Sequence, residues 1–347
     1  MVFFIFVKKN FTMELTLEQI QNFKGKYPKQ LWSLFTVEMW ERFCFYGMRG
    51  VLTYFMVDQL LLKDDVANLQ YGAIQAFVYA FTFIGGIFAD KILGFKKSLF
   101  FGGMVMILGN LLIAIAPKDM FYYGIAFSII GTGFFKPNVS SMVGELYHED
   151  DPRRDAGYGM FYAGINIGGF LGGILCIYLG KYYSWQLCFL ASAIVMVLGL
   201  LTFLFTKNKL GPIGNSPLSH LPKTKRLTKE ILVYALSLLS IPLIFIMVKN
   251  TDYTDYFMYT IGIIAIAYFL FEVFKIGELS AQKKIIAAFV FIFFYFLFNA
   301  IYEQSGGSLS LFAKYNLNDK LLGLTIDPNA VNNSSNTLFV IILSPLI

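Results

Sequence analysis

Four ionisable side chains lie in an otherwise apolar and aromatic stretch near the amino terminus, LWSLFTVEMWERFCFYGMRGVLTYFMV. They are Glu38, Glu41, Arg42 and Arg49. A helix turns 100° per residue, so residues 38, 42, 45 and 49 fall within about 60° of one another. If this helix crosses a membrane, each charge costs about 2.5–3.5 kcal/mol at mid-bilayer. The stripe must then face the protein interior, where the acids and guanidinium groups neutralise one another.

Such a stripe suits the handling of protons and carboxylates. Arginine stays charged at any relevant pH and grips a carboxylate with two parallel hydrogen bonds. Glutamates beside it can carry protons. The alternative is a purely structural ion-pair network. Intramembrane ionisable residues usually mark a substrate or proton route, which favours the functional interpretation.

The composition makes lipid the expected solvent of this chain. Apolar residues make up 57% of the 347 residues and charged residues 14%, with a mean hydropathy of +0.62. The three cysteines stand at unrelated spacings inside apolar runs, so no disulfide framework or metal cluster is predicted. The net charge of +6 lies in short basic clusters that alternate with acidic or neutral connections between apolar runs. This positive-inside pattern predicts a cytoplasmic amino terminus and a cell-membrane location, and it argues against a nucleic-acid partner.

The apolar runs predict an all-α polytopic membrane protein, since about 20 apolar residues are needed to cross a bilayer. The predicted spans are 31–60, 71–89, 99–116, 121–144, 156–179, 186–206, 230–249, 257–275, 285–315 and 336–347.

The predicted spans and their connections divide the chain into five regions. No strands are expected. The Gly-, Pro-, Ser- and Lys-containing stretch between the sixth and seventh spans reads as a linker. The tenth span is too short to cross, which predicts that the chain is a fragment or a truncated product. The regions are a cytoplasmic segment (1–30), a six-helix bundle (31–206), a cytoplasmic linker (207–229), an inserted helical pair (230–275) and an incomplete second bundle (276–347).

Two further charges fall inside predicted spans. Lys136 lies in GTGFFKPNVSSMVG, and Glu303 lies in IYEQSGGSLSLFA. A lysine and a glutamate on separate helices of one bundle are natural ion-pair partners, and protonation of the acid would release the lysine. The sequence leaves open whether these two pair.

The ordered set of motifs resembles the proton-dependent oligopeptide transporter family, the peptide transporter branch of the major facilitator superfamily. Residues 38–43 match its ExxERF motif, and GGIFADKILGFKK is similar to the superfamily's loop motif between helices two and three. GTGFFKPNVSSMVGELY, DPRRDAG and FYAGINIGG match the family's block in helices four and five, and EQSGGSL is similar to its helix seven motif. Taken alone, the glycine-rich pieces are explained by ordinary helix packing.

The resemblance implies a major facilitator fold with two inserted helices, ending here in helix eight, and a role for each matching residue. The carboxylate of a di- or tripeptide would meet a basic group, other polar residues would touch the peptide, and carboxylates would couple transport to protons. The implied substrate residues are Arg42, Arg49, Lys136, Tyr46, Tyr79, Tyr162, Asn166 and Glu303; the proton-coupling residues are Glu38, Glu41, Glu303 and Lys136; and the conformational latch is Asp90.

The sequence departs from the family pattern at several positions. Phe45 stands where many members have tyrosine, and Asn299 stands where tryptophan is frequent. Gly72 lies where animal members carry a coupling histidine, so coupling is expected to rest on carboxylates. Helices eight to twelve, which normally close the cavity, are expected to be missing beyond Ile347.

The leading hypothesis is therefore a monomeric proton-coupled symporter of di- and tripeptides. The alternatives are a relative that carries another anionic solute, such as nitrate or an acidic metabolite, and an inactive fragment. An enzyme is disfavoured because the sequence shows no nucleophile–base pair, no metal-ligand spacing and no phosphate loop. No cofactor is expected apart from the proton as coupling ion.

Overall fold

Helices make up most of the part of the chain that the computed structural model describes, residues 15–321 and 324–343. Their order along the chain follows the apolar runs. The first group is α1 (Leu17–Gln21), α2 (Lys29–Asp58), α3 (Asp64–Phe88), the π-helical turn η1 (Ala89–Leu93), α4 (Phe95–Ile115), α5 (Phe121–Glu145), α6 (Arg153–Tyr182) and α7 (Trp185–Thr206). The second group is η2 (Lys207–Leu210), η3 (Pro217–His220), α8 (Lys223–Leu239), α9 (Ile241–Lys249), α10 (Thr251–Lys275), α11 (Leu279–Tyr302), η4 (Glu303–Gly306), α12 (Ser308–Asn316), β1 (Lys320–Leu321), β2 (Leu324–Thr325) and α13 (Pro328–Leu343).

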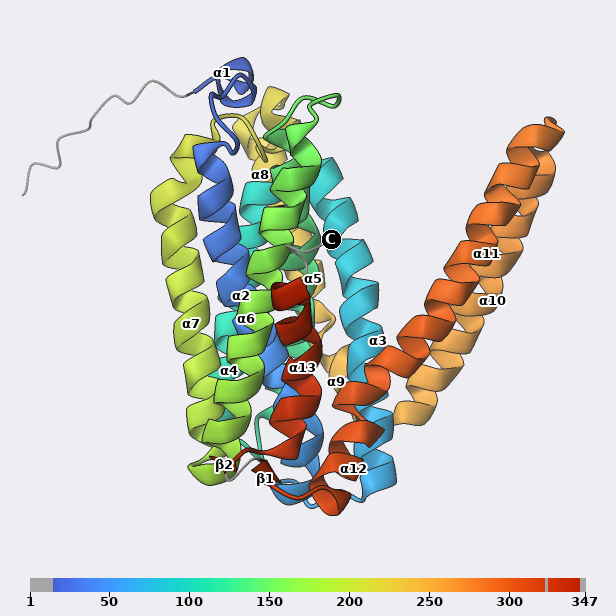
Figure 1. Cartoon of the computed structure of the whole chain (residues 1–347). Helices are drawn as coiled ribbons and strands as arrows, with labels where there is room; N and C mark the ends of the chain where they lie inside the picture. The colour runs from blue at the N-terminus through green and yellow to red at the C-terminus, as the bar shows by residue number, and fades with distance from the viewer. Residues whose placement is uncertain (1–14, 322–323, 344–347) are drawn as a thin grey trace, which may run out of the picture.

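Helices α2 to α7 form one bundle with α2 near its centre (Figure 1). The most extensive packing is between α2 and α6 and between α4 and α5, and α3 packs on α5. Aromatic rings fill the middle of the bundle. Phe55 stacks on Phe121 with ring centroids 4.9 Å apart, and the ring of Phe189 meets Phe55 edge-on at 5.5 Å.

Small residues let α6 approach α2 closely. Gly164, Gly168 and Gly172 recur every four residues on one face of α6. A Cβ atom on Gly168 would lie 2.1 Å from the backbone oxygen of Met39, which no real Cβ tolerates. The glycines of the FYAGINIGG motif are therefore explained by helix packing, which holds α2 and its charged stripe against α6.

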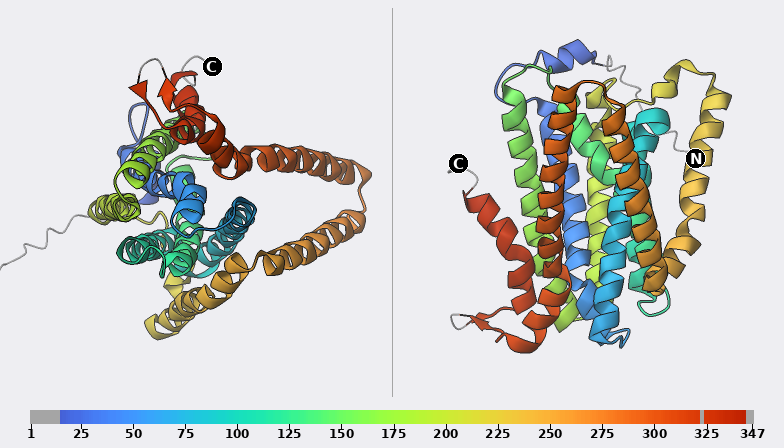
Figure 2. Two further views of the ribbon diagram at one scale, coloured as in Figure 1. Left: turned by 90° about the horizontal axis from the view of Figure 1, so that it is seen from below. Right: turned by 90° about the vertical axis from the view of Figure 1, so that its right-hand side faces the viewer.

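The seventh predicted span is divided in two. Helix α8 ends and α9 begins at Ser240, next to Pro242, which cannot donate a helical hydrogen bond. Helix α8 already begins at Lys223, inside the stretch predicted as a linker. Helices α10 and α11 then form a long hairpin that projects away from the bundle (Figures 1 and 2). None of the described side chains of α11 is buried, so this hairpin presents apolar side chains outward.

The ninth predicted span is interrupted at the EQSGG sequence. Helix α11 ends at Tyr302, the 3-10 turn η4 follows, and α12 continues after Gly307. The chain then makes a short antiparallel pair of strands, β1 and β2, where no strands were expected. Helix α13 returns to pack on α6. The break in the span places Glu303 at an irregular turn rather than on a continuous helix.

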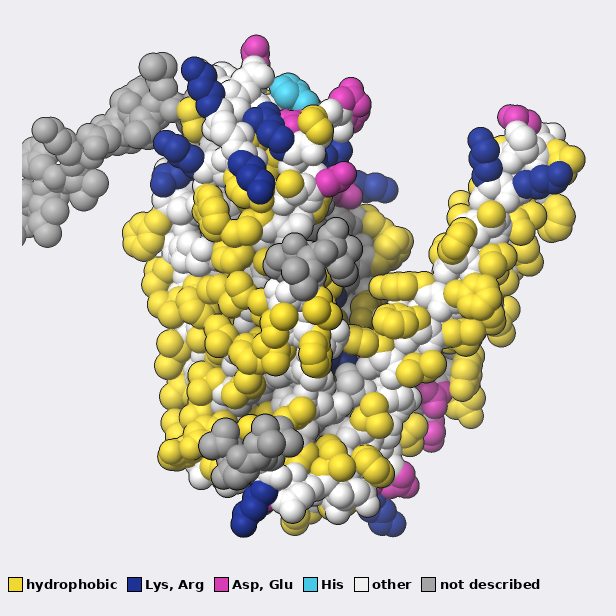
Figure 3. All heavy atoms as spheres, viewed as in Figure 1, with side chains coloured by type: hydrophobic (Ala, Val, Ile, Leu, Met, Phe, Trp, Pro, Cys, Tyr) yellow, Lys and Arg dark blue, Asp and Glu magenta, His cyan; other side chains and the backbone are white. Residues whose placement is uncertain are grey.

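The structure is that of a multi-pass membrane protein. Among the described residues, seven helical segments are long and apolar enough to cross a membrane by length and composition. The helix that carries the charged stripe, α2, is not one of them. Apolar side chains cover the sides of the visible face in Figure 3, and most lysines, arginines and acids lie toward its two ends. Residues 344–347, the end of the tenth predicted span, lie outside the described residues.

Arg153, in the DPRRDAG sequence, binds the segment that precedes α2. Arg153 binds Asp151 through a 2.7 Å ion pair, and its guanidinium lies 3.9 Å from the ring centroid of Phe23. The guanidinium also donates to the backbone oxygen of Gly25. Side-chain hydrogen bonds from Arg153 lower the pKa of Asp151 to about 2. The carboxylate therefore stays charged throughout the physiological range.

We predict that Gly168→Ala destabilises the protein by about 1–3 kcal/mol, because the new methyl group would overlap the backbone of α2. The matched control is Gly159→Ala on the same helix, where nothing lies within 4 Å of the added atom. The control should be neutral or slightly stabilising, since alanine favours helix over glycine. Thermal unfolding in detergent measures both. Equal melting temperatures for the two variants would contradict the close α2–α6 contact.

Candidate functional site

The first charge cluster lies entirely on α2. Glu38, Glu41 and Arg42 are all buried, each with no more than 2% of its surface exposed. The Arg42 Nε atom lies 2.9 Å from Glu38 Oε1, and its Nη2 atom forms an ion pair with Glu41. The Arg42 guanidinium also lies 5.2 Å from the ring centroid of Phe45. One helical turn thus holds two carboxylates and one guanidinium, as the stripe predicted.

Lys136 enters the same region from α5, just before the proline inside that helix. Its Nζ atom lies 5.8 Å from the ring centroid of Phe45 and 5.3 Å from that of Tyr79. Among the residues that the structure describes, no carboxylate lies within ion-pair distance of this ammonium group. Aromatic faces attract a cation, but they leave its three donors free. Lys136 is therefore placed to receive an anion.

The second charge cluster joins three parts of the chain. The Arg49 Nη2 atom lies 3.0 Å from Glu303 Oε2, and Arg49 Nε donates to the hydroxyl of Tyr71 at 2.9 Å. Tyr71 and Tyr79, both on α3, donate to opposite oxygens of the Glu303 carboxylate at 3.1 and 3.0 Å. Arg49 Nη2 also donates to Ser305 Oγ at 3.0 Å. The Glu303 carboxylate is the common partner of α2 and α3.

Backbone contacts fix the η4 turn around this cluster. The hydroxyl of Thr53 on α2 donates to the carbonyl of Gly306. A Cβ atom on Gly306 would lie 2.1 Å from the hydroxyl oxygen of Tyr71, so a larger residue could not occupy this position without moving that tyrosine. The Tyr46 and Tyr302 rings lie 5.9 and 5.5 Å from the Arg49 guanidinium. The break in the helix and the glycine after it are what let Glu303 reach Arg49.

The observed partner of Glu303 differs from the one that the sequence suggested. Their charges make Lys136 a natural partner for Glu303, but the carboxylate pairs with Arg49, and Lys136 is not within 4.0 Å of it in the described part of the chain. The physical reason is the irregular turn, which places Glu303 opposite Arg49. Tyr79 still connects the two groups, because its hydroxyl binds Glu303 and its ring faces Lys136.

Sequence reasoning missed Tyr71 and Ser305. A usable signal for Tyr71 was its position eight residues before Tyr79, which places both side chains on one face of a helix. Ser305 belongs to the EQSGG sequence, but nothing in the sequence reveals that the span breaks there. The contact with Arg49 follows from that break.

A cavity of about 460 Å³ lies beside this second cluster, between α3 and the α11–α12 segment. Its walls include Tyr71, Tyr79 and Glu303, so the Glu303 carboxylate is accessible from it. Gly72 and Asn299, two of the departures from the family pattern, also line this cavity. Nothing lies within 4 Å of a Cβ atom added to Gly72, which leaves that part of the wall open.

Three other predicted site residues make no hydrogen bond or ion pair with either cluster in the described part of the chain. Tyr162 is half exposed, and the buried Asn166 donates its amide to the Tyr162 carbonyl one turn earlier on α6. Neither makes a hydrogen bond to the clusters within the described residues. Asp90 is exposed on η1 and borders a cavity of about 220 Å³ with Glu145. No group of three metal-ligating side chains occurs in the part of the chain that the structure describes.

Comparison with known proteins identifies the family. The model of the POT family matches residues 96–347, which is most of the chain. The chain belongs to the POT family. It is therefore a member of a transporter family rather than an enzyme family. The dipeptide and tripeptide permease A of Proteus mirabilis (strain HI4320) is 31% identical over 325 residues, covering 93% of this chain and 65% of the permease. An uncharacterised transporter of Bacillus subtilis (strain 168) is 33% identical over 329 residues, covering 92% of this chain and 67% of that protein.

Solved structures agree with this assignment. A mutant of the peptide transporter POT in complex with alafosfalin superimposes with a TM-score of 0.80 at 31% identity, covering 96% of this chain and 70% of that chain. A POT family transporter in complex with 5-aminolevulinic acid gives a TM-score of 0.82 at 26% identity, covering 95% and 72%. The chain spans less than two thirds of the length of the Proteus permease that it matches.

We predict that Glu303→Gln lowers the free energy of unfolding by about 1–3 kcal/mol, because it leaves the buried Arg49 guanidinium without its carboxylate. The Glu303 side chain is 22% exposed, so the lower half of that range is expected. The control is Glu272→Gln, whose 4.0 Å pair with Lys275 is exposed and whose loss should be close to neutral.

The double variant Arg49→Met/Glu303→Gln isolates the pairwise interaction. It should lose less stability than the sum of the two single variants, because neither partner is then left buried alone. Thermal or denaturant unfolding in detergent measures all four proteins. Additive losses would show that the two side chains do not interact.

Proposed function

We propose that this chain provides the proton- and carboxylate-handling bundle of a proton-coupled symporter of di- and tripeptides. The ion pair between Arg49 on α2 and Glu303 on η4 is the observation that carries the proposal. It joins the first bundle to the start of the second through a group that a proton can neutralise. The printed names of relatives, which include dipeptide and tripeptide permeases, support the same substrate class.

The peptide carboxylate would bind at Lys136, with Arg42 beside it. Among the described residues, the Lys136 ammonium group has no ion-pair partner and lies near two aromatic rings, whereas Arg42 is already neutralised by Glu38 and Glu41. Protonation of either glutamate would free part of the guanidinium, so the arrival of a proton and the arrival of a carboxylate favour each other. The exposed Tyr162, together with Tyr46 and Asn166, would contact the remainder of the peptide.

Glu303 would couple the proton to movement. In its charged form the carboxylate holds Arg49 and accepts hydrogen bonds from Tyr71 and Tyr79. In its protonated form it loses the ion pair, so that only the hydrogen bonds from Thr53 to Gly306 and from Arg49 to Ser305 still hold η4 on α2. Transporters of this kind alternate access by rocking two bundles about a midplane site. The bridge between α2 and η4 is positioned to be broken and remade in each cycle.

The proposed role of Asp90 and the orientation of the protein in the membrane follow from where charged residues lie on the bundle. Asp90 lies at the exposed η1 turn between α3 and α4, where a contact to the opposite bundle would act as a latch. The basic end of the bundle, which includes the start of α4 and the end of α7, would face the cytoplasm together with the amino terminus. The protein would reside in the cell membrane and work as a monomer.

Uptake into proteoliposomes tests the proposed function. We expect radiolabelled di-alanine to accumulate when the exterior is more acidic than the lumen and to be displaced by unlabelled dipeptides. Accumulation that ignores the proton gradient would refute the coupling. Competition by nitrate but not by peptides would favour the alternative anionic solute. Specific di-alanine binding without accumulation would show that the chain holds the substrate site but does not complete the transport cycle.

Glu303→Gln and Lys136→Ala should each abolish gradient-driven uptake, since the first cannot be deprotonated and the second lacks the cation for the peptide carboxylate. Lys118→Ala is the control, because Lys118 is exposed in the connection between α4 and α5. Membrane insertion is checked by yield and monodispersity after extraction. Wild-type uptake in either site variant would remove that residue from the mechanism.

Arg42→Lys should weaken di-alanine binding about tenfold or more, because lysine cannot reproduce the fork of parallel donors that arginine offers to a carboxylate. Arg153→Lys is the matched control, since Arg153 lies at the start of α6 far from this cluster. Binding is measured by calorimetry on detergent-solubilised protein. Equal affinity for Arg42→Lys and wild type would show that Arg42 makes no bidentate contact with the peptide.

A further inference from the structure

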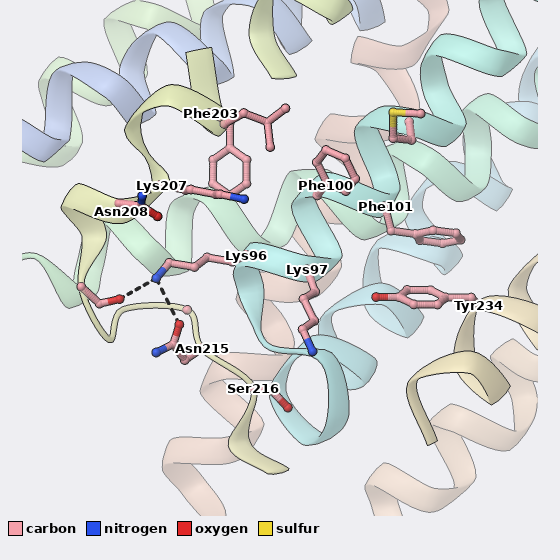
Figure 4. A pocket seen from close by; sticks show the side chains of 14 residues that line it. Lys96, Lys97, Phe100, Phe101, Phe203, Lys207, Asn208, Asn215, Ser216 and Tyr234 are labelled. Atoms are coloured by element: carbon pink, nitrogen blue, oxygen red, sulfur yellow. Dashed lines mark hydrogen bonds between the residues drawn. The ribbon is translucent and has the colours of Figure 1, made fainter. Parts of the chain in front are cut away.

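A second, separate cavity of about 580 Å³ opens at the basic end of the bundle (Figure 4). Its walls come from the start of α4, the end of α7, the connection after α7, and α8. It shares no residue with the charge clusters of α2, so the proposed transport mechanism does not use it. In Figure 4 Phe100, Phe101 and Tyr234 lie on one side of the pocket and Asn208 and Asn215 on the other, with Lys96 between them.

One wall of this pocket is apolar and continues along the outside of the bundle. Phe100 and Met104 are one turn apart on α4 and are partly exposed, and Leu108, one turn further, continues the same exposed stripe beyond the pocket. Phe203 and Leu204 of α7 close the wall from the other side. A polar soluble ligand would bury no apolar surface against such a stripe, whereas an acyl chain can lie along it.

The other wall is cationic. Three lysines line it, and none of the fourteen described lining residues is acidic. The Lys96 ammonium donates to the carbonyl of Gly211 at 2.5 Å and to Asn215 Oδ1 at 3.1 Å, and Lys97 lies 2.6 Å from a carboxylate oxygen of Glu230. Lys207 makes no ion pair with any residue that the structure describes. The pocket therefore joins an excess of positive charge to an apolar groove that runs toward the bilayer interior.

We propose that this pocket binds one anionic glycerophospholipid of the cytoplasmic leaflet. The phosphate would lie between Lys97 and Lys207, the Asn208 amide would donate to the headgroup, and an acyl chain would follow Phe100 and Met104. Basic pockets at the cytoplasmic ends of membrane helices attract anionic headgroups, and the apolar stripe selects a lipid over a free anion. A zwitterionic lipid would bring its own cation against the lysines and bind less well.

Such a lipid would also stabilise the position of the connection that follows α7. The backbone N–H of Lys96 on α4 donates a hydrogen bond to the Gly214 carbonyl of this connection at 3.0 Å. The Ser216 hydroxyl donates to the Ile92 carbonyl at 2.6 Å. A phosphate shared by Lys97 and Lys207 would add a further link between α4 and η2. The lipid would therefore stabilise the cytoplasmic side of the bundle.

Native mass spectrometry of the delipidated chain in detergent tests the proposal. Phosphatidylglycerol and phosphatidylcholine with identical acyl chains are titrated separately, and we expect tighter binding of the first to a single site. Lys207→Gln should weaken that binding about fivefold, the contribution of one lysine near an anionic headgroup. The matched control is Lys209→Gln, because Lys209 is exposed on the same η2 turn and does not line the pocket.

Three results would overturn the proposal. Equal binding of the two lipids would show that charge does not select the occupant. Equal weakening by Lys207→Gln and Lys209→Gln would indicate diffuse attraction rather than a pocket. Complete displacement of phosphatidylglycerol by millimolar glycerol 3-phosphate would identify a site for a soluble phosphate instead of a lipid.

A steric pair of variants tests the acyl groove independently of charge. Met104→Trp fills the groove and should reduce phosphatidylglycerol binding, whereas Leu190→Trp, at an exposed apolar position of α7 that does not line the pocket, should not. Melting temperatures of the lipid-free proteins check that both variants are folded. Unchanged lipid binding in a folded Met104→Trp protein would exclude this groove as the acyl site.

Discussion

Burying charge in an apolar bundle is the constraint on which the arrangement of this protein depends. A buried charge is tolerated only when it is paired and hydrogen-bonded. The two arginines of α2 find their carboxylate partners in different ways. Arg42 is neutralised by Glu38 and Glu41 on its own helix, so this cluster forms as soon as α2 is folded and covered by its neighbours. Arg49 lies two turns further and finds its carboxylate, Glu303, more than 250 residues later in the chain.

This difference gives the two clusters different structural consequences. The ion pairs of the first cluster lie within α2 and do not join it to any other helix. The second ties α2 and α3 to the η4 turn, and it requires the ninth predicted span to break so that its carboxylate can turn inward. Gly306, which packs directly on the Tyr71 hydroxyl, is part of that requirement. A long-range ion pair at an irregular turn is easier to release than a core of interlocked side chains, because a single proton removes its attraction.

The sequence predicted the elements better than it predicted their contacts. Apolar runs and the cost of membrane charges placed the six helices from α2 to α7 and located the charged stripe, because both depend on local composition. The pairing of Glu303 could not be predicted, since it depends on where the helix breaks and how the following segment folds back. The break between α8 and α9 was missed for a similar reason, although Pro242 offered a local signal. The β1–β2 pair is too short to produce an alternating pattern.

The two clusters also explain why Lys136 is the group best suited to receive a substrate anion in the proposed mechanism. Both arginines already have carboxylate partners, so an arriving carboxylate would have to displace a glutamate at either position. Lys136 has aromatic faces as its cation-binding neighbours, and these do not use its hydrogen-bond donors. Tyr79 lies between this lysine and Glu303, with its ring toward one and its hydroxyl bound to the other. An anion that draws Lys136 away from the Tyr79 ring would therefore disturb the hydrogen bond that holds Glu303, which links substrate binding to the bridge between α2 and η4 through a single side chain.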